Sequence, residues 1–87
     1  MKRIIEDTDN PSGLEALLGE RVILLCSNYF YAGKLVGVNA DHVELSEASI
    51  VYETGPWGDK VYKDSQSLPA AIWRVRTSFI ESYGPGK

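Results

Sequence analysis

The chain has 87 residues, 44% of them hydrophobic and 24% charged, with a formal net charge of −3. This length predicts one globular domain over residues 1–87, and the acidic balance argues against a general binder of nucleic acid. A single cysteine, Cys26, and a single histidine, His42, exclude an internal disulfide and a structural zinc site. No apolar run approaches the roughly 20 residues of a membrane helix, and the first residues lack the apolar stretch of a signal peptide, so we expect a cytoplasmic protein.

The charge is unevenly distributed along the chain. Residues 1–53 contain four basic and nine acidic side chains, whereas residues 54–87 contain five basic and three acidic ones. Basic surfaces attract anionic ligands. A surface that binds anions is therefore expected to draw on the second part of the chain.

After an N-terminal extension at residues 1–8, the sequence predicts a short α-helix at residues 9–19. Asn10 can cap this helix, Pro11 suits its first position, and Gly19 can end it. Its apolar face consists of three leucines at helical spacing: Leu14, Leu17 and Leu18. So short a helix is not stable alone, and its leucines must pack on another element.

Two strands are predicted next, at residues 21–26 and 30–38, with a tight turn between them. The first strand is apolar on both faces, where Val22, Leu24 and Cys26 alternate with Ile23 and Leu25. Such a strand is covered on both sides, and the helix leucines are the expected cover on one of them.

A third strand is predicted at residues 43–54, after a polar turn with the sequence NADH. Its apolar face changes parity, because Val43 and Leu45 share one phase and Ala48, Ile50 and Tyr52 share the other. This change requires an extra residue, so we expect a bulge near Ser46 and Glu47. In the second strand, Gly33 permits a sharp bend where no side chain fits.

The remaining sequence predicts a long polar loop at residues 54–70, or an irregular hairpin there in which Val61 and Tyr62 pair briefly. A strand at 71–76, a kink at 76–78, a closing strand at 79–83 and a frayed tail at 84–87 follow. Trp73 is expected in the core or in an interface. One short helix and five bent strands predict a mainly β fold, a strongly bent and partly open SH3-like β-barrel. The edges of an open barrel can pair between copies, and a head-to-tail contact that closes makes a ring.

The order of these elements, together with the segment GKLVGVNADHVEL, resembles the Sm/LSm family. The residues that fit the first Sm motif are Gly33, Leu35, Val38, Asn39, Val43 and Leu45. Those that fit the second motif are Val75, Arg76, Ile80 and Tyr83. Thr77 replaces the glycine of the second motif, and His42 and Val43 stand where leading members have a Met-Asn pair. In this respect the spacing is nearer to that of the Hfq-like bacterial branch. The chain therefore resembles a divergent member of the family, of bacterial or phage type.

The resemblance implies a homo-oligomeric ring of about five to seven subunits. It also implies that the NADH turn (residues 39–42) and the kink at residues 76–78, the RTS turn, lie together at the inner rim and bind single-stranded RNA, or DNA. The candidate nucleic-acid-binding residues are Asn39, Asp41, His42, Arg76, Thr77 and Ser78. No cofactor and no metal are expected; the partners are other copies of the chain and the nucleic acid.

The chemistry of these side chains fits that role, although each has an alternative. The Arg76 guanidinium can bind a phosphate or stack on a base, or it can lie on a solvent face paired with Glu81 or Glu44. Asn39 can read a base edge or hold its own turn. His42 can stack on a base or be merely solvated, and Asp41, which repels phosphate, would have to read donor groups of a base.

The loop at residues 54–70 offers further candidate contacts at Trp57, Lys60 and Lys63. Trp57 is either a stacking platform for a base or a side chain packed over its own loop or on a neighbouring subunit. An enzyme is not expected, because Cys26 is in phase with buried residues and no catalytic pair has recognisable spacing. The alternative function is an SH3-like module for protein interaction without nucleic acid, with a contact surface at Tyr29, Tyr31, Trp57 and Tyr62.

Overall fold

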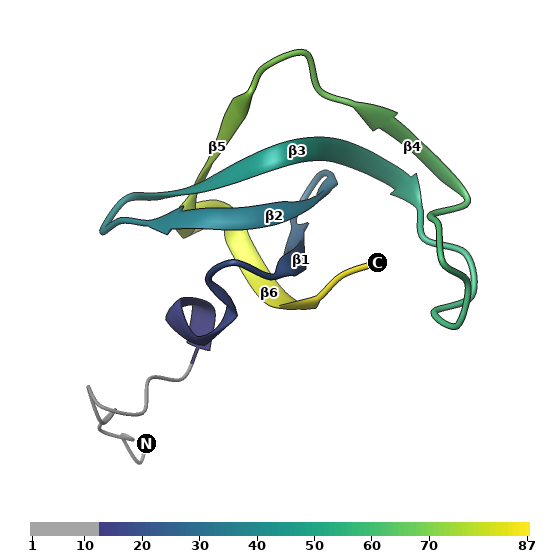
Figure 1. The fold of residues 1–87 in the computed structure, drawn as a ribbon, viewed down its shortest axis with the longest axis horizontal. Helices are drawn as coiled ribbons and strands as arrows, with labels where there is room; N and C mark the ends of the chain where they lie inside the picture. Colours follow the sequence, from purple (N-terminus) through teal and green to yellow (C-terminus); the bar gives the residue numbers. More distant parts are fainter. Residues whose placement is uncertain (1–12) are drawn as a thin grey trace.

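The computed structural model describes residues 13–87, which form a mainly β structure (Figure 1). Its strands are β1 (Arg21–Cys26), β2 (Phe30–Val38), β3 (His42–Glu53), β4 (Asp64–Ser67), β5 (Ile72–Arg76) and β6 (Ile80–Pro85). Two short 3-10 segments accompany them, η1 (Gly13–Leu17) and η2 (Thr77–Phe79). The predicted mainly β class is therefore confirmed.

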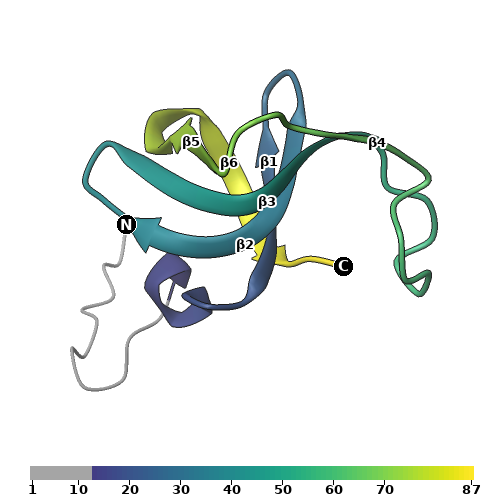
Figure 2. The same ribbon diagram turned by 45° about the horizontal axis from the view of Figure 1, so that its top comes forward.

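The strands form one antiparallel sheet, in which β3 pairs with three other strands. The order is β4-β3-β2-β1-β6, and β5 also pairs with β3. β5 lies along the first part of β3, from His42 to Ser46, whereas β4 lies along the second part, from Ser49 to Glu53. Two views show β3 as a long bent strand that carries these two partners in succession (Figures 1 and 2). β5 and β6 are joined through η2 but are not paired, so the sheet is not closed among residues 13–87.

The predicted bulge in β3 is confirmed at Glu47. Ala32 pairs with Ser49 and Lys34 pairs with Ser46, so two residues of β3 face the single residue Gly33. Glu47 has a φ of 50°, a left-handed conformation. A β-carbon on Gly33 would lie 2.9 Å from the carbonyl oxygen of Ser46, too close for any side chain. Glycine is therefore required where β3 crowds β2.

Apolar residues occupy both faces of β1, as predicted. Eight buried residues form the larger cluster: Val22, Leu24, Cys26, Leu35, Val43, Leu45, Ala48 and Val75. Ile23 lies in a smaller cluster on the other face with Ala32 and Val51. Leu14, Leu17 and Trp73 pack against the larger cluster, which confirms the cover predicted for this face and the place of Trp73.

The ends of several elements differ from the prediction. Of the helix predicted at residues 9–19, the described part shows only residues 13–17 as helical, in a 3-10 turn, and Leu18 is exposed rather than packed. Residues 1–12, including the first part of the expected helix, lie outside the described residues. No helix among residues 13–87 has the length and apolar character needed to cross a membrane.

The expected loop at residues 54–70 is interrupted by β4, whose four residues are all exposed. They pair with β3 through the backbone ladder and carry no apolar side chain, so hydrophobic alternation did not mark them. Residues 84–87, expected to fray, begin inside β6, and Gly86 donates a backbone hydrogen bond to Arg21 at 2.9 Å.

Candidate functional site

The turn between β2 and β3 and the turn between β5 and β6 lie against each other. The amide of Thr77 donates a hydrogen bond to the carbonyl oxygen of Asp41 at 3.0 Å. One step along the ladder, His42 is paired with Arg76. The antiparallel pairing of β3 with β5 thus brings the NADH and RTS segments, far apart in sequence, into one place.

Three side chains of the first turn form a short polar chain. The side-chain amide of Asn39 lies 3.2 Å from Nε2 of His42, and Nδ1 of His42 lies 2.7 Å from a carboxylate oxygen of Asp41. An amide N–H donates to Nε2 when the ring proton is on Nδ1, which then donates to Asp41. The Asn39 backbone amide also donates to the His42 carbonyl at 2.8 Å. The turn therefore holds its own polar groups in fixed positions.

Asp41 and His42 differ in their exposure to solvent. The Asp41 side chain is 89% exposed, whereas that of His42 is 32% exposed. The hydrogen bond from His42 is the main cause that lowers the pKa of the Asp41 carboxyl below its ordinary value, and the charges of His42 and Arg76 act in the same direction. Asp41 is thus the solvent-facing group of the turn, and the imidazole of His42 stabilises its ionised form.

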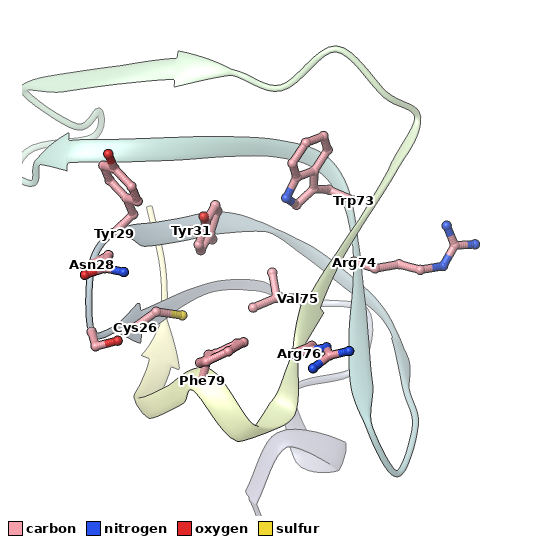
Figure 3. A pocket seen from close by; sticks show the side chains of 10 residues that line it. Cys26, Asn28, Tyr29, Tyr31, Trp73, Arg74, Val75, Arg76 and Phe79 are labelled. Atoms are coloured by element: carbon pink, nitrogen blue, oxygen red, sulfur yellow. The ribbon is translucent and has the colours of Figure 1, made fainter.

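Arg76 carries an uncommitted positive charge at this site. Its neighbour on the same strand, Arg74, forms an ion pair with Glu44 at 3.3 Å. Within the described part of the chain Arg76 has no ion-pair partner, neither Glu44 nor Glu81. The side chain is exposed and stands at the end of β5, beside η2 (Figure 3). Its guanidinium donors are therefore free for an anionic or planar ligand.

The two turns line an open hollow of about 530 Å³. Its lining residues are Ala40, Asp41, Arg76, Thr77 and Ser78. The hydroxyl of Thr77 is buried and has no hydrogen-bond partner among the described residues, whereas Ser78 is exposed. The hollow therefore offers one cation, one carboxylate and one accessible hydroxyl within a small area.

A second hollow, of about 370 Å³, lies on the other side of Arg76. The rings of Tyr29, Tyr31, Trp73 and Phe79 line it, between the β1–β2 turn and the β5–η2 segment (Figure 3). Arg76 borders both hollows. Sequence reasoning missed Phe79, which is 57% exposed; an apolar residue directly after a polar turn was the available signal.

The loop candidates lie apart from the turn site. β3 starts at His42 beside the two turns and ends at Glu53, where the loop with Trp57 begins, and both views place this loop at the far end of β3 (Figures 1 and 2). Lys63 forms an ion pair with Glu53 at 3.3 Å, and Lys60 is exposed. Trp57, Lys60 and Lys63 are therefore not brought together with Arg76 within one chain.

No family model matches the chain, and no curated protein or solved structure matches it either. Within residues 13–87 no three His, Cys, Asp or Glu side chains are grouped as metal ligands would be. Function must therefore be inferred from the chemistry of the two turns and of the strands that hold them.

Proposed function

We propose that this chain is a divergent Sm-like protein with a partly open SH3-like barrel, and that it forms a cytoplasmic homo-oligomeric ring that binds single-stranded RNA or DNA. The binding residues are Asn39, Asp41, His42, Arg76, Thr77 and Ser78. The hydrogen bond from Thr77 to Asp41, at 3.0 Å, is the observation that carries the proposal. An Sm-like site requires the two motif turns to lie together, and they are 3.0 Å apart at this bond.

The chemistry of the site suits a single strand better than a duplex. Arg76 supplies a free guanidinium, which binds a phosphate or stacks on a base. Asp41 accepts hydrogen bonds only, so it favours a base that presents an N–H group over a phosphate. Unpaired bases expose those groups, whereas a duplex uses them for pairing. One cation per chain gives weak binding, but a ring repeats it, and multivalency raises the affinity by orders of magnitude.

Free strand edges support assembly into a ring. β5 pairs with β3 on one edge and β6 pairs with β1 on one edge, and the other edge of each is unpaired in the described part of the chain. Large apolar side chains lie exposed beside these edges, at Phe79 on η2 and Tyr83 on β6. Unpaired edges favour pairing with another chain, and pairing β5 of one copy with β6 of the next gives a head-to-tail contact that can close.

Fluorescence anisotropy with labelled uridine-rich and adenine-rich oligonucleotides tests this function. We expect saturable binding of at least one oligonucleotide at moderate salt, with an affinity that falls as salt rises. A duplex of the same length is expected to bind more weakly. Absence of saturable binding of either single strand at low salt would reject the nucleic-acid function.

A protein-interaction module is the second candidate, and the aromatic hollow beside Arg76 favours it. Tyr29 is 48% exposed there, and its ring meets that of Tyr52 edge-on at 6.3 Å between centroids. The surface expected from sequence is divided, however: Tyr31 packs on the larger apolar cluster, whereas Tyr62 packs on the smaller cluster across the sheet. Such a module would therefore use Tyr29, Tyr31 and Phe79 rather than Trp57 and Tyr62.

A further inference from the structure

The ammonium group of Lys87 is held in the loop that follows β3. Its Nζ donates hydrogen bonds to three backbone carbonyl oxygens, at 2.7 Å to Thr54, 2.8 Å to Pro56 and 3.1 Å to Val61. An ammonium has three N–H donors and no acceptor. The three carbonyls therefore satisfy its entire hydrogen-bonding capacity.

Two aromatic rings complete the surroundings of this ammonium. Nζ of Lys87 lies 5.8 Å from the ring centroid of Trp57 and 5.2 Å from that of Tyr62. A cation within about 6 Å of an aromatic face is attracted by the negative potential of the ring. Carbonyl dipoles and aromatic faces thus both favour a positive charge at this point.

The loop has backbone bonds of its own that do not involve Lys87. The amide of Lys63 donates to the Thr54 carbonyl at 3.3 Å, and that of Asp59 donates to the Pro56 carbonyl at 3.1 Å. Two of the three carbonyls that face the ammonium are therefore positioned by the loop itself. We therefore expect the loop to keep this shape when its occupant is removed.

The main chain near Lys87 is fixed separately. Gly86 donates to the carbonyl of Arg21 at 2.9 Å, and a β-carbon on Gly86 would lie 2.8 Å from the backbone of Val22. The amide of Lys87 donates to the Tyr62 hydroxyl at 3.0 Å. These contacts fix the main chain at residues 86 and 87, so the Lys87 side chain enters the loop at a defined position. The site is therefore occupied by a side chain of the same chain.

We propose that the loop from Thr54 to Tyr62 is a binding site for a primary alkylammonium group, which Lys87 occupies in the isolated chain. The class of ligand follows from the geometry, because three converging carbonyls match the three donors of –NH₃⁺. A planar guanidinium cannot direct three donors in this way, and a quaternary ammonium has no N–H to donate. The site lies at the far end of β3 from the two turns, so this proposal is independent of nucleic-acid binding.

NMR titration of the ¹⁵N-labelled Lys87→Ala variant with n-propylammonium chloride tests the proposal. Alanine removes the ammonium together with its alkyl chain and keeps the backbone amide that donates to Tyr62, so the site is emptied. We expect saturable shifts of the Trp57 indole N–H and of the amides of Gly55 and Asp59. The wild-type protein is expected to show no saturable shift at the same concentrations, because its site is already filled.

Selectivity and a matched variant complete the experiment. Tetramethylammonium and methylguanidinium are expected to bind at least about tenfold more weakly, as follows from the loss of directed hydrogen bonds. Lys63→Ala, which removes the loop lysine paired with Glu53, should behave as wild type. Absent saturation in Lys87→Ala, equal shifts in the wild-type protein, or equal binding of tetramethylammonium would each overturn the proposal.

Discussion

The amide of Thr77 donates a hydrogen bond to the carbonyl oxygen of Asp41, and this 3.0 Å contact joins the NADH turn to the RTS turn. It is a backbone contact, so it depends on the pairing of β3 with β5 and not on the choice of either side chain. Variants of the side chains around it can therefore be tested without loss of the geometry.

Replacement of Arg76 by alanine is expected to weaken binding of a single-stranded oligonucleotide by about tenfold or more, because a charged hydrogen bond contributes roughly 1.5–3 kcal/mol. The salt dependence should become flatter, since each lost phosphate contact reduces the slope of log K against log salt by about 0.7 on a single strand. Anisotropy titrations at several salt concentrations measure both quantities.

Arg74→Ala is the matched control for this variant. It removes the same charge from the same strand, but the guanidinium of Arg74 is already paired with Glu44 at 3.3 Å. We expect a smaller loss of affinity and a slope close to that of the wild-type protein. Equal effects of the two variants would show that net charge, and not the position of Arg76, governs binding.

Gly33→Ala is expected to destabilise the fold by about 1–3 kcal/mol, a usual cost of overpacking. The new β-carbon would meet the Ser46 carbonyl oxygen at 2.9 Å and the Ala48 α-carbon at 3.1 Å, and both belong to the backbone of β3. Urea denaturation measures the change. Gly58→Ala, whose β-carbon would meet nothing within 4 Å, should be nearly neutral; similar losses in both variants would contradict the close approach.

The carboxyl of Asp41 is expected to titrate below its ordinary pKa of 3.8, because His42 donates a hydrogen bond to the carboxylate. Since the folded pKa is depressed, the stabilising effect is complete above pH 3.8 and is lost as the pH falls through the folded pKa. NMR titration of the carboxyl carbon gives the midpoint. His42→Ala should move it back toward 3.8, and an unmoved midpoint would remove His42 as the cause.

The Cys26 thiol is expected to react slowly with a disulfide reagent in the native protein. Burial raises its pKa above the ordinary value of 9.0, and the charge of Glu81 adds to this, so the reactive thiolate is scarce near neutral pH. We expect the native thiol to react with a disulfide reagent at least about tenfold more slowly than the thiol of the urea-unfolded chain. Equal rates in the two states would show that Cys26 is accessible.

The sequence predicted the features of this fold that leave a hydrophobic pattern. The parity change between Leu45 and Ala48 located the bulge at Glu47, and the alternation in β1 indicated burial on both faces, with Cys26 in the core. β4 left no such pattern, because its Asp-Ser-Gln-Ser sequence is exposed and pairs through the backbone. Leu18 continued the spacing of the helix but lies outside the short 3-10 turn and is exposed.

The candidate site was predictable in part. The meeting of the NADH and RTS turns was an expectation from family resemblance, and the β3–β5 register brings them together. The sequence did not indicate which arginine Glu44 would pair with, because Arg74 and Arg76 share one phase of the strand. The Lys87 site was also beyond sequence reasoning, since its acceptors are backbone carbonyls of a loop and not side chains.

Native mass spectrometry of the wild-type protein mixed with a uridine-rich or adenine-rich oligonucleotide tests the central claim most directly, because it reports assembly and binding together. A closed oligomer of about five to seven copies of the 9.6 kDa chain carrying a bound oligonucleotide is the expected result. A monomer free of nucleic acid at micromolar concentration would contradict the account.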